Sequence, residues 1–205
     1  AMHHAKHVLG KKYEDCCFIV CHIDGGISVS AHRYGRIIDC NDAAGGDGPY
    51  TPTRIGSVSV ADILEYVRDK DIDEVKKLCT RTGGFVSHFG TSSSDAVHRM
   101  AEEGNKKAIR VWDGMKYQIV KYIGAMAAVL GGRVDGILLT GGLLRFEDIT
   151  QTIREQCEWI APVSTYPGEV EHEALAAGAL RVLRGEEEPK HYTGRPVWDG
   201  WHDED

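Results

Sequence analysis

The sequence predicts an α/β fold in which helices flank a mixed β-sheet. Three observations support this prediction. Residues 18–40 contain three short strand-like segments, and residues 95–130 keep a helical period. Strand-like and helix-like segments then alternate as far as the closing helix expected at residues 171–184. Paired glycines stand at two of the strand ends, where α/β sheets place ligand crevices.

The first predicted strands form an antiparallel meander. Residues 18–22 are a short apolar run bounded by polar residues, which is typical of a buried strand. Residues 27–34 alternate between apolar and polar side chains and predict a second strand; after a glycine turn, residues 36–40 predict a third. Ahead of the meander, residues 3–12 predict the end of a helix, closed by Gly10.

The middle of the chain is predicted to hold two loops and several helices. Residues 41–58 are rich in Gly, Pro, Asn and Asp, and long loops inside compact domains are usually functional. Residues 60–68 and 72–79 predict two short amphipathic helices, and residues 83–94 a second loop that ends in an N-cap region. The helical period of residues 95–130 is expected to break at Gly104.

The last third of the chain is predicted to add two strands to the meander's sheet. We expect strands at residues 134–140 and 160–165, with a helix between them that ends at Cys157. For domain organisation, we expect one lobe over residues 1–187 and a charged surface tail over residues 188–205.

Composition excludes several classes of function. The 205 residues carry a formal net charge of -7, and binding to nucleic acid or to an anionic membrane uses basic patches instead. We expect no membrane span, because no apolar stretch is long enough. The six cysteines include no Cys-x-x-Cys pair, which argues against a zinc site or a disulfide framework and favours a cytoplasmic protein.

Two glycine motifs suggest binding of an anion such as phosphate. Residues 24–26 (Asp-Gly-Gly) join two strands, so the backbone could approach a phosphate and leave amide N–H groups free to donate, and Ser28 could add a hydroxyl. The alternative is a plain type I′ hairpin turn. Residues 140–142 (Thr-Gly-Gly) precede a helix, whose N-terminus would favour an anion. The alternative here is a turn without a ligand.

Together these segments resemble the acetate and butyrate kinases, a family of the sugar kinase, heat-shock-70 and actin superfamily. The resemblance is carried, in order, by residues 18–28, 39–54, 83–91, 117–130, 138–143 and 161–183. It implies an actin-like ATPase (ribonuclease-H-like) lobe. Within the family, the GPYTPTR loop (residues 48–54) and the YPGE segment (residues 166–169) favour the butyrate kinase branch.

The resemblance also implies roles for individual residues. Arg54 is expected to be catalytic, because it matches a loop arginine that faces the transferred phosphoryl group; the alternative is a solvated loop arginine. Glu171 is expected to associate with Mg²⁺, although the helix dipole alone favours a glutamate there. The residues expected to bind ATP or ADP are His22, Asp24, Gly25, Gly26, Ser28, His88, Phe89, Thr140, Gly141 and Gly142.

Three of these residues carry alternatives that the sequence leaves open. The family usually has a small residue where this chain has Asp24, and a carboxylate there would repel a γ-phosphate unless Mg²⁺ intervenes. Asp24 could therefore hold a metal-bound water or could impair phosphate binding. His88 and Phe89 could stack on adenine, but single residues of these types more often serve packing.

The implied activity is ATP-dependent phosphorylation of a short-chain, butyrate-like carboxylate to an acyl phosphate, and its reversal. In the family a separate N-terminal lobe supplies a second phosphate loop and much of the acyl pocket. We therefore expect this chain to be the nucleotide-binding half, inactive alone, and to form a homodimer as the family does. The alternatives are a non-catalytic nucleotide-binding or dimerisation module, and another kinase of the superfamily.

Overall fold

The computed structural model describes residues 1–168, 171–189, 191–192 and 194. These residues divide into two compact units, Ala1–Gly168 and Glu169–Asp205. All strands of the described residues lie in the first unit, as does the candidate site. The second unit contributes helix α8 (Glu171–Leu183), which agrees with the closing helix predicted at residues 171–184.

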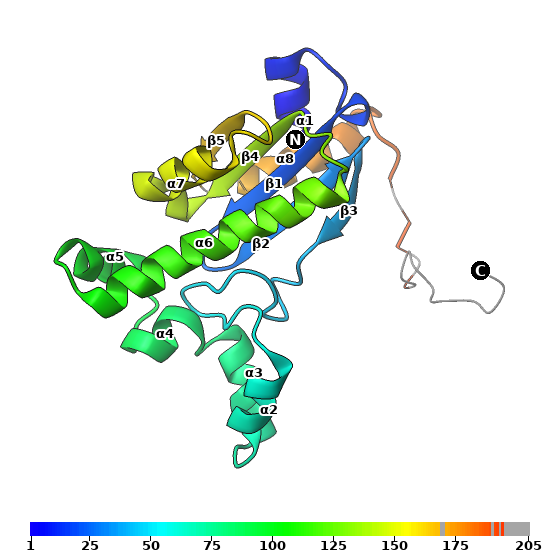
Figure 1. Cartoon of the computed structure of the whole chain (residues 1–205). Coiled ribbons are helices and arrows are strands. Elements are labelled where there is room, and N and C mark those ends of the chain that lie inside the picture. Colours follow the sequence, from blue (N-terminus) through cyan, green and yellow to red (C-terminus); the bar gives the residue numbers. More distant parts are fainter. Residues whose placement is uncertain (169–170, 190, 193, 195–205) are drawn as a thin grey trace. The chain divides into compact units, whose positions relative to one another are not determined.

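A five-stranded mixed sheet forms the centre of the first unit (Figure 1). Its strands are β1 (Cys17–Ile23), β2 (Ile27–Arg33), β3 (Arg36–Cys40), β4 (Gly136–Gly141) and β5 (Val163–Pro167), in the order β3-β2-β1-β4-β5. Neighbours β1, β2 and β3 pair antiparallel, while β4 runs parallel to both β1 and β5. The predicted meander and the addition of two later strands to the same sheet are both confirmed.

Helices α5 (Ser94–Glu102), α6 (Lys106–Val129) and α7 (Glu147–Cys157) belong with one face of this sheet. Helix α6 crosses β1 and β2 (Figure 1), so its apolar stripe closes the main core. The stripe consists of Ala108, Val111, Trp112, Met115, Ile119, Ile123, Met126 and Ala127. Each large side chain buried in this way contributes about 1.5–3 kcal/mol relative to leaving it exposed.

The predicted helix break lies where expected. Gly104 has a φ of +86°, which ends α5, and the Asn105 side chain then caps α6 by accepting from Lys107 N at 3.0 Å and Ala108 N at 3.1 Å. Glycine removes the Cβ penalty of the left-handed conformation, so one helical pattern becomes two helices at an angle.

The opposite face of the sheet packs against the N-terminal segment. Helix α1 (Met2–His4) continues into the π-helix η1 (Ala5–Leu9) and ends at Gly10, as predicted. A 3₁₀ turn, η2 (Tyr13–Asp15), then leads into β1. A second apolar cluster lies here and consists of Ala5, Cys16, Phe18 and Leu138.

A buried histidine lies among polar partners on β2. His32 is 8% exposed; its Nδ1 is 2.7 Å from the Tyr13 hydroxyl and its Nε2 is 2.9 Å from the Ser30 hydroxyl. Burial lowers the pKa of His32 to about 4, because the imidazolium form would lose its hydration. His32 is therefore held neutral at physiological pH.

The segment between the sheet and α5 forms three short helices: α2 (Val60–Val67), α3 (Ile72–Thr80) and α4 (Gly84–Phe89). The first two match the prediction. Residues 84–89 were expected to be loop and instead form α4, because Gly84 at φ +53° turns the chain against the carbonyl groups of the preceding loop. Among the described residues, no helix is both long and apolar enough to cross a membrane.

Candidate functional site

The two glycine motifs lie side by side at one edge of the sheet. His22 on β1 pairs with Thr140 on the parallel strand β4, so the chain leaves both strands at the same level. The residues that follow are Asp24, Gly25 and Gly26 after β1, and Gly142 after β4. Carboxyl ends of adjacent parallel strands are where α/β sheets bind ligands.

Three predicted residues share the sheet face opposite α6. His22 pairs with Ser28 across the antiparallel β1–β2 ladder and with Thr140 across the β1–β4 ladder, and directly paired residues point to the same side. His22 is exposed, while Ser28 and Thr140 are half-buried. The register thus brings these three side chains together next to the glycine turns.

The turn between β1 and β2 is not the plain hairpin turn. Three residues, Asp24 to Gly26, separate the last pair Ile23 and Ile27, and the Asp24 N–H donates to the Gly26 carbonyl at 3.1 Å. A type I′ turn needs positive φ at both central residues, whereas neither Gly25 nor Gly26 has one. The structure therefore contradicts the type I′ alternative.

Arg54 lies against Gly26, so a residue with a Cβ at position 26 would require the flexible end of the Arg54 side chain to move. A Cβ on Gly26 would overlap the Arg54 guanidinium group, with the Arg54 Cζ only 2.7 Å away. The arginine predicted to be catalytic thus lies directly over the predicted phosphate turn, although 28 residues separate the two along the chain (54 minus 26). Among the described residues, the guanidinium group has no ion-pair partner.

Both its backbone conformation and a neighbouring carbonyl group require a glycine at position 141. Its backbone has φ +108° and ψ 163°, a conformation that is essentially restricted to glycine. A Cβ there would overlap the Ile23 carbonyl, with the Ile23 carbonyl carbon 2.7 Å away. The absence of a side chain at Gly141 thus serves the close approach of β4 to the end of β1.

Asp24 joins the two turns to each other. Its Oδ1 accepts from the Gly25 N–H at 2.7 Å and its Oδ2 accepts from the Gly142 N–H at 2.8 Å. The expectation that the amides of the first turn are free to donate is therefore wrong for Gly25, and the Gly142 amide is bonded as well. A carboxylate from the chain itself already occupies the position next to both.

The second motif also differs from its prediction at the helix. After Gly141 the chain forms the 3₁₀ turn η3 (Gly142–Arg145), and α7 begins only at Glu147. The amide nearest the strand end is thus that of Gly142 in this 3₁₀ turn. It does not belong to the first turn of a long helix. The predicted helix dipole does not act directly at Gly142, because the dipole's effect falls off within one helical turn.

A tight turn holds Arg54 in its loop. Thr51 is 1% exposed, and its hydroxyl accepts from the N–H groups of Thr53 at 3.2 Å and Arg54 at 3.1 Å. The Thr51 N–H in turn donates to the Arg54 carbonyl at 3.1 Å. Helix α4 closes over this turn, since a Cβ on Gly84 would overlap the Thr51 carbonyl. Residues 83–84 were predicted to open a loop; here they pack against the turn that holds Arg54.

The rest of the 41–58 loop is fixed by side chains that bond to the backbone. Asn41 is 8% exposed; its Oδ1 accepts from the Val29 N–H at 2.8 Å, and its Nδ2 donates to the carbonyls of Ile27 and Asp47 at 3.1 and 3.0 Å. In the middle of the loop, the Gln118 side chain on α6 accepts from the Tyr50 N–H at 2.8 Å. The loop is thereby attached to both the sheet and α6.

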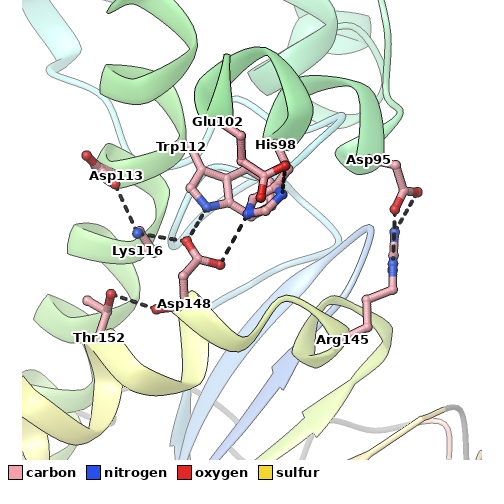
Figure 2. A network of polar contacts seen from close by, with 9 residues as sticks. All are labelled: Asp95, His98, Glu102, Trp112, Asp113, Lys116, Arg145, Asp148 and Thr152. Atoms are coloured by element: carbon pink, nitrogen blue, oxygen red, sulfur yellow. Dashed lines mark hydrogen bonds and ion pairs between the residues drawn. The ribbon is translucent and has the colours of Figure 1, made fainter. Parts of the chain in front are cut away.

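A polar network supports the segment that follows the second glycine turn (Figure 2). Asp148 in the first turn of α7 accepts from the Trp112 indole N–H at 2.7 Å and from Lys116 Nζ at 2.9 Å. Its other oxygen is buried and lies 3.6 Å from His98 Nε2. Burial alone would raise the pKa of Asp148, yet the bonds from Lys116 and Trp112 hold it below its usual value.

Arg145 contacts the second glycine turn itself. Its Nη1 donates to the Gly142 carbonyl at 2.9 Å, and its Nη2 pairs with Asp95 at the start of α5, also at 2.9 Å (Figure 2). The guanidinium also stacks 4.5 Å from the centre of the Phe146 ring. Sequence reasoning missed Arg145 and Asp148; their one signal was the group of charged residues at 145–148, which follows the glycine motif after two leucines.

Two predicted nucleotide contacts bond to the start of α6. His88 and Phe89 lie at the end of α4, where Lys107 Nζ donates to the His88 carbonyl at 2.6 Å and lies 5.1 Å from the Phe89 ring centre. Burial, and then the charge of Lys107, lower the pKa of His88. Both residues therefore have packing contacts within the chain, and these contacts do not depend on a bound base.

The predicted metal ligand, Glu171, belongs to the second unit. Glu171 begins α8 in the second unit, and its side chain lies outside the described residues. In the part of the chain that the structure describes, no group of three or more His, Cys, Asp or Glu side chains could hold a metal ion. Magnesium carried by a nucleotide needs fewer protein ligands, because it takes phosphate oxygens and water.

Comparison with known proteins identifies the family. The model of the acetokinase family matches residues 1–166, which is well over half of the chain. The chain belongs to the acetokinase family. Solved acetokinase-family structures share its fold: Porphyromonas gingivalis acetate kinase superposes with a TM-score of 0.76 at 22% identity, over 87% of this chain and 52% of that chain.

Two further structures agree. Acetate kinase from Entamoeba histolytica gives a TM-score of 0.73 at 16% identity, over 82% of this chain and 52% of that chain. A propionate kinase from Francisella tularensis gives 0.67 at 20% identity, over 77% and 41%. The predicted actin-like α/β lobe is thus confirmed. The chain spans about half the length of the acetate kinases that it matches.

Proposed function

We propose that this acetokinase-family chain is the nucleotide-binding half of a carboxylate kinase, which transfers a phosphoryl group between ATP and a short-chain carboxylate. The observation that carries the proposal is the position of Arg54 over Gly26, at the edge where both glycine turns meet. The turns and the guanidinium group come from three separate segments of the chain. Their convergence supports a phosphate site.

Each group has a chemical task in this proposal. The backbone at residues 24–26 lies close to the nucleotide phosphates, and the segment at residues 140–142 borders the nucleoside. Arg54 stabilises the transferring phosphoryl group, because its planar fork can donate two parallel hydrogen bonds to phosphate oxygens. Phosphoryl transfer depends chiefly on positioning and charge stabilisation. Magnesium, when bound with the nucleotide, would neutralise part of the phosphate charge.

We further propose a substrate of the butyrate type. The GPYTPTR loop and the YPGE segment favour that branch, while the pocket for the acyl group belongs mostly to the other half of the fold. The chain alone is then expected to be inactive, since a transition state held from one side lacks half of its contacts.

Arg54→Ala tests the proposal in the chain completed with the other half of an acetokinase-family fold. Acyl phosphate made from ATP and butyrate is trapped as the hydroxamate. We expect kcat to fall by about 100-fold or more while ATP affinity changes little, because charge-stabilising groups act mainly in the transition state. Arg54→Lys should recover little activity, since a point charge does not replace the guanidinium fork.

Arg36→Ala is the matched control, because Arg36 is an exposed arginine on the edge strand β3. It should leave kcat unchanged. Near-normal turnover of Arg54→Ala would show that Arg54 does not act on the phosphoryl group. A higher kcat/KM for acetate than for butyrate would remove the butyrate assignment but keep the carboxylate kinase. Full activity of the 205-residue chain by itself would refute the two-half mechanism.

A further inference from the structure

The Asp24 carboxylate lies where the proposed site would hold an anion. Its two oxygens accept from the N–H groups of Gly25 at 2.7 Å and Gly142 at 2.8 Å. One amide belongs to each glycine turn. Backbone amides at glycine turns are donors of the kind that bind phosphate oxygens, and they favour any negatively charged acceptor.

The space around these amides is also limited. A Cβ on Gly142 would be only 2.9 Å from Asp24 Oδ2, so the carboxylate is packed directly against the Gly142 backbone. Across the first turn, the Arg54 guanidinium lies against Gly26 but forms no ion pair with Asp24. The carboxylate therefore uses the amide donors and leaves the cation beside them without a salt bridge within the described residues.

We propose that Asp24 is an internal competitor for the nucleotide phosphate: a phosphate binds the two glycine turns only when the Asp24 carboxylate rotates away from the Gly25 and Gly142 amides. This inference rests on the proposed nucleotide site. It adds a device to that site, since a residue of the chain itself sets the affinity. A rotation about the side-chain bonds of Asp24 frees both donors without moving the sheet.

The competition has a measurable sign. Asp24→Ala removes both the competing acceptor and a negative charge next to the ligand, so an anion should bind more tightly. Charge-assisted hydrogen bonds are about twice as strong as neutral ones, and we expect the dissociation constant to fall about tenfold or more. Asp24→Asn keeps an acceptor oxygen but loses the charge. Its dissociation constant for the anion should lie between those of the parent chain and Asp24→Ala.

A nuclear magnetic resonance titration of the 205-residue chain with ADP and with inorganic pyrophosphate tests this. Amide shifts of Gly25 and Gly142 report binding even at millimolar dissociation constants. Both titrations are run with and without Mg²⁺. Thermal unfolding of each variant is measured in parallel, because loss of the two bonds should lower the melting temperature of Asp24→Ala.

Asp135→Asn is the matched control. Asp135 also holds a backbone amide with its carboxylate, that of Cys17 at 2.8 Å, but at the opposite end of β1. It should lower the melting temperature without changing anion affinity. The same pattern in Asp24→Ala, lower stability and unchanged affinity, would reduce Asp24 to a structural link and overturn the inference.

The remaining outcomes are equally decisive. Weaker binding of Mg²⁺–ADP by Asp24→Ala would show that Asp24 recruits the metal, which also overturns competition. If neither the parent chain nor Asp24→Ala binds ADP or pyrophosphate, the proposed nucleotide site fails and this inference fails with it. Binding that Asp24→Ala does not strengthen overturns this inference alone.

Discussion

Gly141→Ala should destabilise the fold severely, for reasons that the backbone makes explicit. A residue with a Cβ held at φ +108° and ψ 163° costs about 1–3 kcal/mol in backbone strain. The new methyl group would also overlap the Ile23 carbonyl, and forcing atoms into a packed position typically costs about 1–3 kcal/mol more. Together these terms give a loss of about 4 kcal/mol, a large fraction of the stability of an ordinary domain.

Comparison with Gly131→Ala isolates the cost of the overlap with the Ile23 carbonyl. Gly131 has a φ of +62°, yet a Cβ there would meet nothing within 4 Å. Its replacement should cost only about 1–2 kcal/mol, the penalty of the left-handed conformation. Urea unfolding of both variants, analysed at constant slope, measures the difference. If Gly141→Ala is within about 1 kcal/mol of Gly131→Ala, the close approach of β4 to Ile23 does not limit this position.

Two further predictions concern the interior. Because of His32, the free energy of unfolding should fall as the pH drops from about 6.5 to 4. The pKa of His32 in the folded chain, about 4, lies below its ordinary value, so the unfolded chain binds more protons in this pH range. The loss of stability should reach up to about 3 kcal/mol. Urea unfolding across this range should show a shallower pH slope for His32→Gln than for the parent chain. Asp148→Asn should cost about 2 kcal/mol, because Lys116 and Trp112 lose a charged acceptor. Unchanged chemical unfolding of Asp148→Asn would show that the charge of Asp148 in this network does not contribute to stability (Figure 2).

The strands and most helices were predictable because they depend on short-range patterns. Alternation placed β2, and the Gly35 turn placed β3, within a residue of their ends, and Gly104 marked the gap between α5 and α6. Helix α4 was not predictable: its six residues hold no clear period, and it forms because Gly84 packs on the carbonyls of a loop 30 residues earlier (84 minus 54).

The candidate site shows the same limit more sharply. The glycine motifs and Arg54 were identified from their residue types, and the parallel pairing of β1 and β4 explains why they meet. The sequence pattern did not predict which backbone amides of the glycine turns remain available to a ligand. Their availability depends on the direction of one carboxylate, Asp24, toward a residue 118 positions away. Whether His88, Phe89 and Glu171 take part in binding stays a prediction.

The anchored loop at residues 41–58 has a consequence for how tightly a ligand could be held. Bonds from Asn41 and Gln118 order this segment when the chain folds, and Thr51 fixes the turn before Arg54. Ordering a free backbone costs about 1–2 kcal/mol per residue. Had the loop been free, association would have had to overcome that loss of entropy. Here that entropy is lost during folding, so the Arg54 backbone is already ordered before binding. In the proposed function, binding of a phosphate then orders only the Arg54 side chain.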